Sequence, residues 1–182
     1  MRDDLIGANL RSLRTRAGVS LSAAAELTGV SKAMLGQIER GESSPTIATL
    51  WKITRGFHLP LTALIEGACA DAPRCGVLEF PGSISVRPVF AFDPALRSET
   101  FLVGLKPGQS HESQPHDLGV VEEVLLKDGQ LEVLQDGAWQ EVALGEGLRF
   151  RADRPHGYRA GPEGARFFNT MHYPAPLLAT EA

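Results

Sequence analysis

The stretch from Ser20 to Gly41 constrains the fold of this chain most, because it has the pattern of two short helices joined by a tight turn. Ser20 and Ser31 are placed as N-caps, where a side-chain oxygen accepts a hydrogen bond from an amide of the first turn. Gly29 falls at the turn and Gly41 follows the second helix, two positions where a positive φ is common. The apolar residues that we expect to face a core recur at helical spacing: Leu21, Ala24, Ala25, Leu27, Leu35 and Ile38.

The other face of the second predicted helix carries Lys32, Ala33, Gly36 and Gln37. Small and amide-bearing side chains suit a close approach to base edges in a major groove. Glutamine can bond adenine through both groups of its amide, and lysine can reach guanine or phosphate. Hydroxyl groups near this helix are candidates for phosphate contacts: Ser31, Ser43, Ser44 and Thr46. The set predicts double-stranded DNA as a partner, with a solvated helix face as the alternative for any single residue.

Three more helices are predicted around this pair. An apolar stripe predicts a helix over residues 4–17, and residues 60–66 have the pattern of a short last helix. Ser44 and Pro45 are expected as the N-cap and the first residue of the helix between them. Arg14 and Glu39 both lie on otherwise apolar faces, so we expect each of them to have a polar partner rather than to be a solvated charge.

Charge is divided unevenly along the chain. Residues 1–68 hold eight Lys and Arg against six Asp and Glu, whereas residues 69–182 hold ten against sixteen, which gives a net charge of −4. A DNA-binding half with so small an excess would use local positive patches rather than a strong overall field. We expect a cytoplasmic protein without a membrane partner, because no apolar run could span a bilayer, the N-terminus lacks an apolar signal core, and only Cys69 and Cys75 could form a disulfide.

Residues 68–76 are rich in Ala, Gly and Pro and predict a linker between a domain at 1–67 and a domain at 77–182. Beyond the linker, short β-rich runs alternate with turn signals. Asp136-Gly137 predicts a two-residue hairpin, and turns are also expected at 127–129 and at Gly161-Pro162. Many short strands at even spacing favour a closed barrel or a sandwich.

The run GVSKAMLGQIERGESSPTIATLWKI at residues 29–53 resembles the helix-turn-helix of the phage-repressor (Cro/XRE) family, and the similarity extends over about residues 5–67. It is especially similar to the sulfur-utilisation regulators, a bacterial branch that joins this domain to a cupin barrel. The resemblance implies a homodimer on a pseudo-palindromic operator, with Arg14 and Glu39 as a partly buried ion pair. Family members often place Gln at the position of Leu21 to touch phosphate, which a leucine cannot do.

The second half resembles the cupin over about residues 77–175. His116-Asp117-Leu118, Glu122 and Gly129 stand where the first cupin motif has two histidines, a glutamate and a glycine, and residues 147–156 resemble the second motif. The fold class implied is a multidomain α+β protein: a five-helix phage-repressor-like domain followed by an all-β cupin barrel, a double-stranded β-helix or jelly roll.

Metal-binding cupins use three histidines and one glutamate, and Leu118 removes one histidine here. His116, Glu122 and His156 remain as a two-His-one-carboxylate set for a divalent metal such as Zn, Fe, Ni or Mn, or as a polar floor for an organic ligand without metal. Strand alternation places Glu122, not Glu123, on the inner face. Arg87 and His172 are also predicted to line this effector pocket, with capped strand ends as the alternative.

Together these patterns predict a ligand-responsive transcription regulator without enzymatic activity, whose effector the resemblance implies to be sulfur-containing or amino-acid-like. One alternative is a metal-dependent cupin enzyme, a dioxygenase or isomerase, fused to a DNA-binding domain, which the missing histidine argues against. Another alternative is a barrel that only dimerises the chain.

Overall fold

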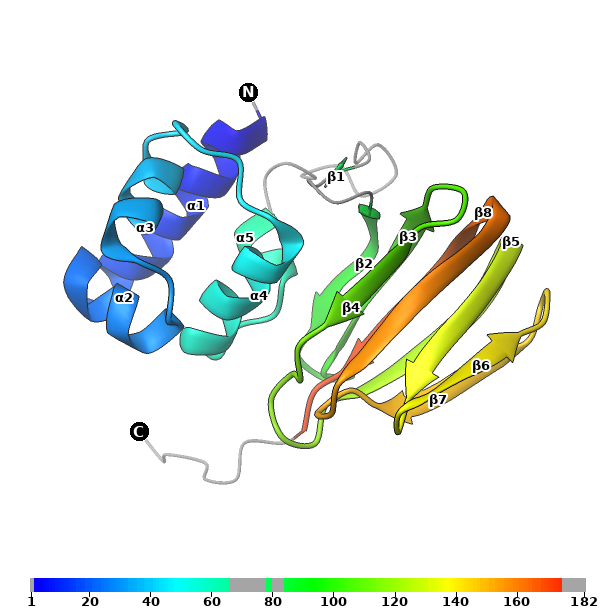
Figure 1. Cartoon of the computed structure of the whole chain (residues 1–182). Helices are drawn as coiled ribbons and strands as arrows, with labels where there is room; N and C mark the ends of the chain where they lie inside the picture. Colours follow the sequence, from blue (N-terminus) through cyan, green and yellow to red (C-terminus); the bar gives the residue numbers. More distant parts are fainter. Residues whose placement is uncertain (1, 66–77, 80–83, 175–182) are drawn as a thin grey trace.

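A computed structural model describes residues 2–65, 78–79 and 84–174 of the chain. Helices occupy the N-terminal part and strands the C-terminal part (Figure 1). We call residues 2–65 the helical domain and residues 78–79 and 84–174 the β domain. The predicted linker, with Cys69 and Cys75, lies outside the described residues, as do the predicted domain ends.

The helical domain contains α1 (Arg2–Arg16), α2 (Leu21–Thr28), α3 (Lys32–Glu39), α4 (Ile47–Gly56) and α5 (Thr62–Ile65). One apolar core joins them, since residues from α1, α3, α4 and α5 are almost fully buried: Leu10, Leu35, Ile38, Leu50 and Leu64. Of the helices in the described part of the chain, none has both the length and the apolar character that crossing a bilayer requires.

The helix-turn-helix pattern forms as the sequence predicts. The Ser20 hydroxyl accepts the Ala23 amide at 3.1 Å, and the Ser31 hydroxyl accepts the Met34 amide at 3.2 Å. Gly29 and Gly41 have φ values of 67° and 69°, the left-handed conformation that ends a helix and that glycine adopts most easily. Both helices therefore begin and end on signals that are local in the sequence.

Two details of the helical prediction are wrong. Helix α4 begins at Ile47, with Thr46 as its N-cap accepting the Thr49 amide at 3.1 Å, so Ser44 and Pro45 precede the helix. Leu27 was expected in the core but is 52% exposed. The buried residues of α2 are instead Ala24 and Thr28.

The β domain is built from antiparallel strands. Their bounds are β1 (Leu78–Glu79), β2 (Ile84–Asp93), β3 (Ser98–Leu105), β4 (Ser110–Ser113), β5 (Val121–Gln135), β6 (Ala138–Val142), β7 (Gly147–Arg151) and β8 (His156–His172). The sheet order is β1-β2-β3-β8-β5-β6, with β4 paired to β8 and β7 paired to β5. The long strands β5 and β8 run side by side through the middle of the domain (Figure 1).

The predicted hairpin at Asp136-Gly137 is confirmed, with φ values of 48° and 81° between β5 and β6. The turns expected at 127–129 and at Gly161-Pro162 are wrong, because β5 and β8 run through both signals as continuous strands. The pairing instead shifts register on either side of Gly129. A Cβ on Gly129 would lie 2.1 Å from the Gly164 carbonyl oxygen, so the glycine permits a close strand approach rather than a chain reversal.

Candidate functional site

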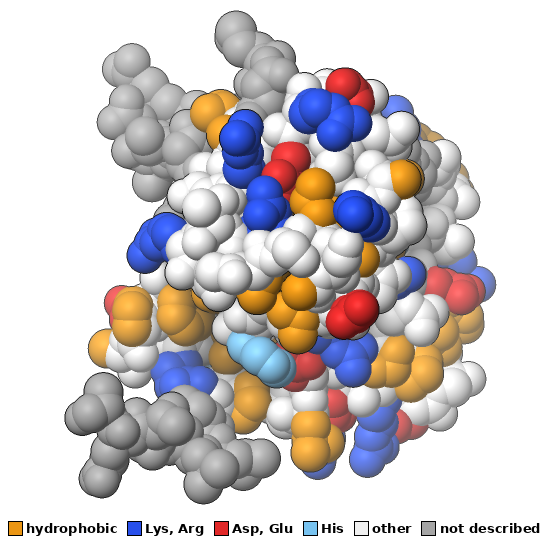
Figure 2. Space-filling model, turned by 90° about the vertical axis from the view of Figure 1, so that its left-hand side faces the viewer, with side chains coloured by type: hydrophobic (Ala, Val, Ile, Leu, Met, Phe, Trp, Pro, Cys, Tyr) orange, Lys and Arg blue, Asp and Glu red, His pale blue; other side chains and the backbone are white. Residues whose placement is uncertain are grey.

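Helix α3 presents two different faces. Leu35 and Ile38 are buried at 1% and 0% exposure, whereas Lys32, Ala33 and Gln37 are exposed. Figure 2 looks onto the helical domain from the left-hand side of Figure 1, and Lys and Arg side chains are spread over this surface. The structure therefore leaves three of the four predicted base-reading residues free to meet a groove.

Gly36 is the exception, because it is buried. A Cβ at this position would lie 3.1 Å from an Nη atom of Arg40 and 3.9 Å from a methyl group of Leu21. The Arg40 guanidinium covers the glycine and is held by Glu42 at 2.8 Å and 2.7 Å. In this conformation Arg40, which the sequence analysis did not select, lies where Gly36 was expected to be open.

The predicted phosphate-contacting hydroxyls lie at helix starts and in the segment before α4. Ser31 and Thr46 accept backbone amides as N-caps of α3 and α4, and the Ser43 hydroxyl lies 3.7 Å from the Met34 sulfur. A hydroxyl that accepts one hydrogen bond can still donate its proton to a phosphate oxygen. Ser44 is exposed in the same segment.

The predicted ion pair between Arg14 and Glu39 is present and bidentate. Arg14 Nε and Nη2 donate to the two carboxylate oxygens at 2.6 Å and 2.9 Å, and Nη1 donates to the Val19 carbonyl at 3.0 Å. The side chains are only 16% and 7% exposed. The pair joins α1 to the end of α3, so it fixes the helix that presents Lys32 and Gln37.

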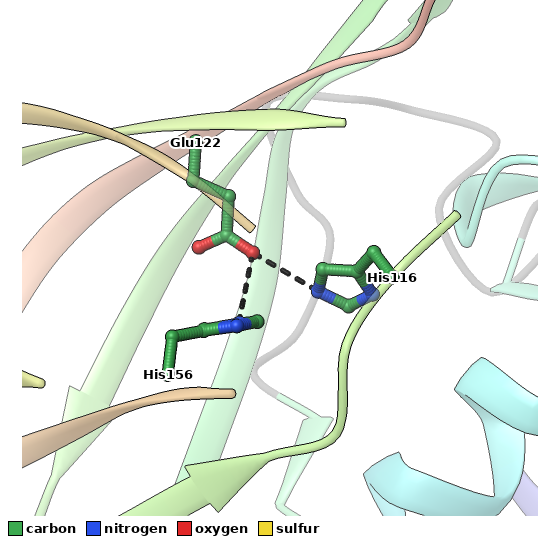
Figure 3. Close-up of side chains that lie close together, drawn as sticks. All are labelled: His116, Glu122 and His156. Carbon is green, nitrogen blue, oxygen red and sulfur yellow. Dashed lines mark ion pairs between the residues drawn. The ribbon is translucent and has the colours of Figure 1, made fainter. Parts of the chain in front are cut away.

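The β domain brings His116, Glu122 and His156 together, as the sequence predicts (Figure 3). His116 Nε2 lies 3.0 Å and His156 Nε2 lies 3.4 Å from Glu122 Oε1, and one ligand atom from each residue falls within 4.8 Å of the others. The side chains are 9%, 3% and 1% exposed in the order His116, Glu122, His156. Glu122 points inward with the buried Val120 and Val124, as alternation predicts.

The second oxygen of Glu122 is held by residues that the sequence analysis missed. Asn169 Nδ2 donates to Oε2 at 2.6 Å and to the Tyr158 hydroxyl at 2.9 Å, and the Tyr158 hydroxyl also donates to Oε2. These bonds fix the carboxylate so that Oε1 faces the two imidazoles. Outer residues of this kind orient the ligands of many metal sites.

The proton positions define what the cluster can hold. His156 Nδ1 donates to the Arg154 carbonyl at 2.8 Å, so Nε2 is the atom aimed at Glu122, and it has no other hydrogen-bond partner among the described residues. Burial would raise the pKa of Glu122, but the hydrogen bonds and charges of His116 and His156 hold that pKa well below its usual value. Burial lowers the pKa of His156, and the stronger effect of Glu122 raises it overall.

A neutral His156 would turn a lone pair toward the carboxylate, so this contact requires a cation: either a proton or a metal ion. Two imidazole nitrogens and one carboxylate oxygen suit a divalent transition metal, and His156 Nδ1 is already fixed by a backbone carbonyl, as in many metal sites. The three residues therefore fit a divalent metal, which is one of the two alternatives that the cupin resemblance leaves open.

Arg87 and His172 do not join the cluster, so this part of the predicted effector pocket is wrong. Arg87 alternates with the buried Val86 and Pro88 and therefore faces outward. His172 is 40% exposed and lies 3.1 Å from Glu123 on the same outer side. Alternation along β2 and β8 was the signal that could have excluded both.

Comparisons with known proteins agree with this geometry. The helix-turn-helix family profile matches residues 10–64. The HTH-type transcriptional regulator SutR of Escherichia coli (strain K12) is 45% identical over 93% of this chain and 95% of its own. The chain belongs to the helix-turn-helix transcriptional regulators.

Similar proteins also confirm the β domain as a cupin. The crystal structure of an HTH_3 family transcriptional regulator from Vibrio cholerae has a TM-score of 0.84 at 41% identity and covers 96% of this regulator and 98% of its own chain. The Cupin_2 domain of an XRE family transcriptional regulator from Enterobacter cloacae is 37% identical with a TM-score of 0.50, covering 51% of this regulator and 99% of its own chain. The regulator is thus a multidomain α+β protein, as predicted.

Proposed function

We propose that this regulator binds operator DNA as a cytoplasmic homodimer and that a small effector in the cupin domain modulates this binding. The observation that carries the proposal is the two-faced α3, which buries Leu35 and Ile38 while Lys32 and Gln37 project outward. Gln37 would read an adenine, and Lys32 a guanine or a phosphate. Ser31, Ser43, Ser44 and Thr46 would position the helix on the phosphate backbone.

A homodimer is supported by an apolar groove on the outer face of the β domain. The groove is lined by residues of β2, β5, β7 and β8: Val89, Phe90, Leu125, Leu148 and Phe168. Phe90 is 68% and Leu125 is 44% exposed, which is costly for a protein that remains a monomer. A second copy on this face would give the regulator two α3 helices, one for each half-site of an operator whose half-sites lie one DNA turn, about 34 Å, apart.

The effector site in this proposal is the interior around His116, Glu122 and His156. A divalent Zn, Fe, Ni or Mn ion would be held by these three residues, and it would supply a fixed positive charge for an effector donor atom. Without metal the same groups would bind an organic ligand directly. The resemblance to sulfur-utilisation regulators supports an effector that is sulfur-containing or amino-acid-like.

The relatives support a regulator without enzymatic activity. They are similar to this protein over most of its length, and they are named as transcriptional regulators. The enzyme alternative would need an additional position on the metal for a substrate and chemistry at that position. The first cupin motif has Leu118 in place of one histidine ligand, and Leu118 is 77% exposed.

The test of DNA reading compares the wild type with Gln37→Ala on a binding site selected from random duplexes. Loss of the bidentate contact should weaken binding by about 1–3 kcal/mol, and mostly at one base position. Gln130→Ala, at an exposed glutamine of the β domain, is the matched control and should bind like the wild type. An equal loss on all sequences would contradict base reading by Gln37.

A further inference from the structure

The helical domain forms part of the wall of the cupin interior. Three of its residues, Ile47, Trp51 and Leu61, line the interior cavity that also contains His116 and Glu122. The Trp51 ring packs edge-on against the His116 ring, with centroids 4.6 Å apart and planes at 60°. A side chain of α4 therefore touches one of the three candidate ligands directly, and α4 is the next helix after the groove-reading α3 (Figure 1).

A second cavity of about 210 Å³ lies between α4 and the segment of residues 111–117. Its wall shares four residues with the interior cavity: Trp51, His111, Ser113 and His116. Burial lowers the pKa of His111, assisted by the charge of His156, so a neutral imidazole is favoured at this boundary. Trp51 and His116 thus separate an interdomain space from the candidate effector site.

Among the polar contacts that join the helical domain to the cupin domain, two differ clearly in burial. In the first, the fully buried Glu99 accepts the amides of Leu61 and Thr62 at 2.9 Å each and is also bonded by the Tyr173 hydroxyl. We call this the Glu99 contact. Such a buried network is costly to break, because each separated group would lose its partner.

In the second, Arg55 of α4 lies 3.0 Å from Asp117, with side chains 60% and 41% exposed. Arg55 also donates to the Pro115 carbonyl at 3.4 Å. We call this the Arg55 contact. Exposed ion pairs contribute about 0–1 kcal/mol, so the Arg55 contact opposes a movement of α4 relative to the segment that carries His116 less than the Glu99 contact does.

We propose that Trp51 closes the effector site and transmits its occupancy to α4, so that ligand binding and DNA binding share one interdomain movement. This inference rests on the proposed function of the cupin interior. A ligand that displaces or fixes His116 must change the packing of Trp51. Because coupling is reciprocal, DNA that selects one position of the helical domain must also change access to His116.

The test measures the rate at which diethyl pyrocarbonate modifies His116 in the metal-free full-length protein, followed by mass spectrometry. Trp51→Ala should raise this rate by about threefold or more, since the side chain that covers His116 is removed. Trp139→Ala is the matched control. Trp139 is the only other tryptophan of the sequence, and it lies on β6, where its ring stacks against the Arg159 guanidinium. Equal rates in Trp51→Ala and the wild type would overturn the closing role of Trp51.

Arg55→Ala serves as a second variant that leaves the core intact and therefore keeps the test valid if Trp51→Ala does not fold. It should also raise the modification rate of His116. An unchanged rate in this variant would overturn the inference that the Arg55 contact limits access to His116.

The coupling is tested by the same reaction with and without saturating DNA carrying the selected site. In the wild type, DNA should change the His116 rate by about fivefold, and in Trp51→Ala the change should fall to near unity. An identical DNA effect in both proteins, or none in the wild type, overturns the inference. Isothermal titration with zinc chloride distinguishes failure of the proposed metal site from failure of this inference. If zinc does not bind, the metal is removed from the proposed function, and the modification rates of His116 still decide the role of Trp51.

Discussion

The two domains each bury a glutamate, and they treat its charge differently. In the helical domain, both oxygens of Glu39 are bonded by one guanidinium, whose third nitrogen donates to the Val19 carbonyl. In the cupin domain, Oε2 of Glu122 is fixed by Tyr158 and Asn169, while Oε1 faces two imidazole nitrogens. The first arrangement is closed, whereas the second leaves a place for a cation.

This difference indicates a structural role for Glu39 and a ligand-binding role for Glu122. The Arg14 guanidinium is permanently charged and occupies both oxygens of Glu39, so this pair joins α1 to α3. An open cluster with oriented outer residues is typical of a site that binds something. The distinguishing feature is the donor: a guanidinium keeps its protons, whereas an imidazole can lose its proton and offer a ring nitrogen to a metal ion.

The largest effect is expected when the closed pair is broken. Glu39→Ala should lower the free energy of unfolding by about 3–5 kcal/mol, because Arg14 keeps a mostly buried charge without its partner. Urea denaturation measures the change. Arg40→Ala, which breaks an exposed pair with Glu42, is the control and should cost less than about 1 kcal/mol. Equal costs would show that the Arg14 pair is no more structural than a surface pair.

The second-largest effect is expected on the zinc affinity of the His116, Glu122 and His156 cluster when a residue that orients Glu122 is replaced. Asn169→Leu removes the amide that fixes Glu122 Oε2, and we expect zinc affinity to fall about 10–100-fold. Isothermal titration calorimetry measures this loss. Thr170→Val, at the adjacent residue whose hydroxyl bonds Thr100 outside the cluster, should keep wild-type affinity. Unchanged zinc binding in Asn169→Leu would mean that Oε2 does not position the ligand oxygen.

A third buried glutamate sharpens the comparison, because Glu99 has amide and hydroxyl donors but no cationic partner among the described residues. Burial raises its pKa despite the hydrogen bonds from Tyr173, Thr62 and Leu61. A raised pKa in the folded state gives a stability contribution that is complete below the pKa of the unfolded chain and lost as pH rises through the folded pKa.

The wild type should therefore lose unfolding free energy relative to Glu99→Gln as the pH is raised from about 4 to about 7. Parallel urea titrations across this range measure the difference, and Glu112→Gln, at an exposed glutamate, is the control. A difference that grows in favour of the wild type with rising pH would contradict the raised pKa of Glu99.

The smallest effect is expected at the domain boundary. Arg55→Ala should change the free energy of unfolding by less than about 1 kcal/mol, since both partners of the Arg55 contact are exposed. Differential scanning calorimetry would reveal a larger loss, and a cost as great as that of Glu39→Ala would show that α4 is fixed to the cupin domain.

Local signals predicted much of this architecture. The caps at Ser20 and Ser31 and the hairpin at Asp136-Gly137 depend on only a few neighbouring residues, so the sequence contains what is needed. The inward position of Glu122 follows from strand alternation alone. The resemblance to a known family supplied the rest, namely the partner of Arg14 and the grouping of His116 with His156.

Features that depend on distant pairing could not be predicted. The strands β5 and β8 override two turn signals because each pairs with the other along most of its length. Tyr158 and Asn169 reach Glu122 only through the register that sets Glu122 opposite Met171, two residues from Asn169. The contact of Trp51 with His116 depends on how two domains meet, and no local pattern encodes that arrangement.

The Glu99 contact also has a mechanical consequence. It fastens the helical domain at α5, beside the cupin domain, while α3 lies on the side turned away from the strands (Figure 1). If the helical domain rotates about this contact, α3 is displaced more than α5, because α3 lies farther from the axis of rotation. In the proposed homodimer, opposite rotations of the two helical domains would change the distance between the two α3 helices, so that they would no longer match two successive major grooves of the DNA.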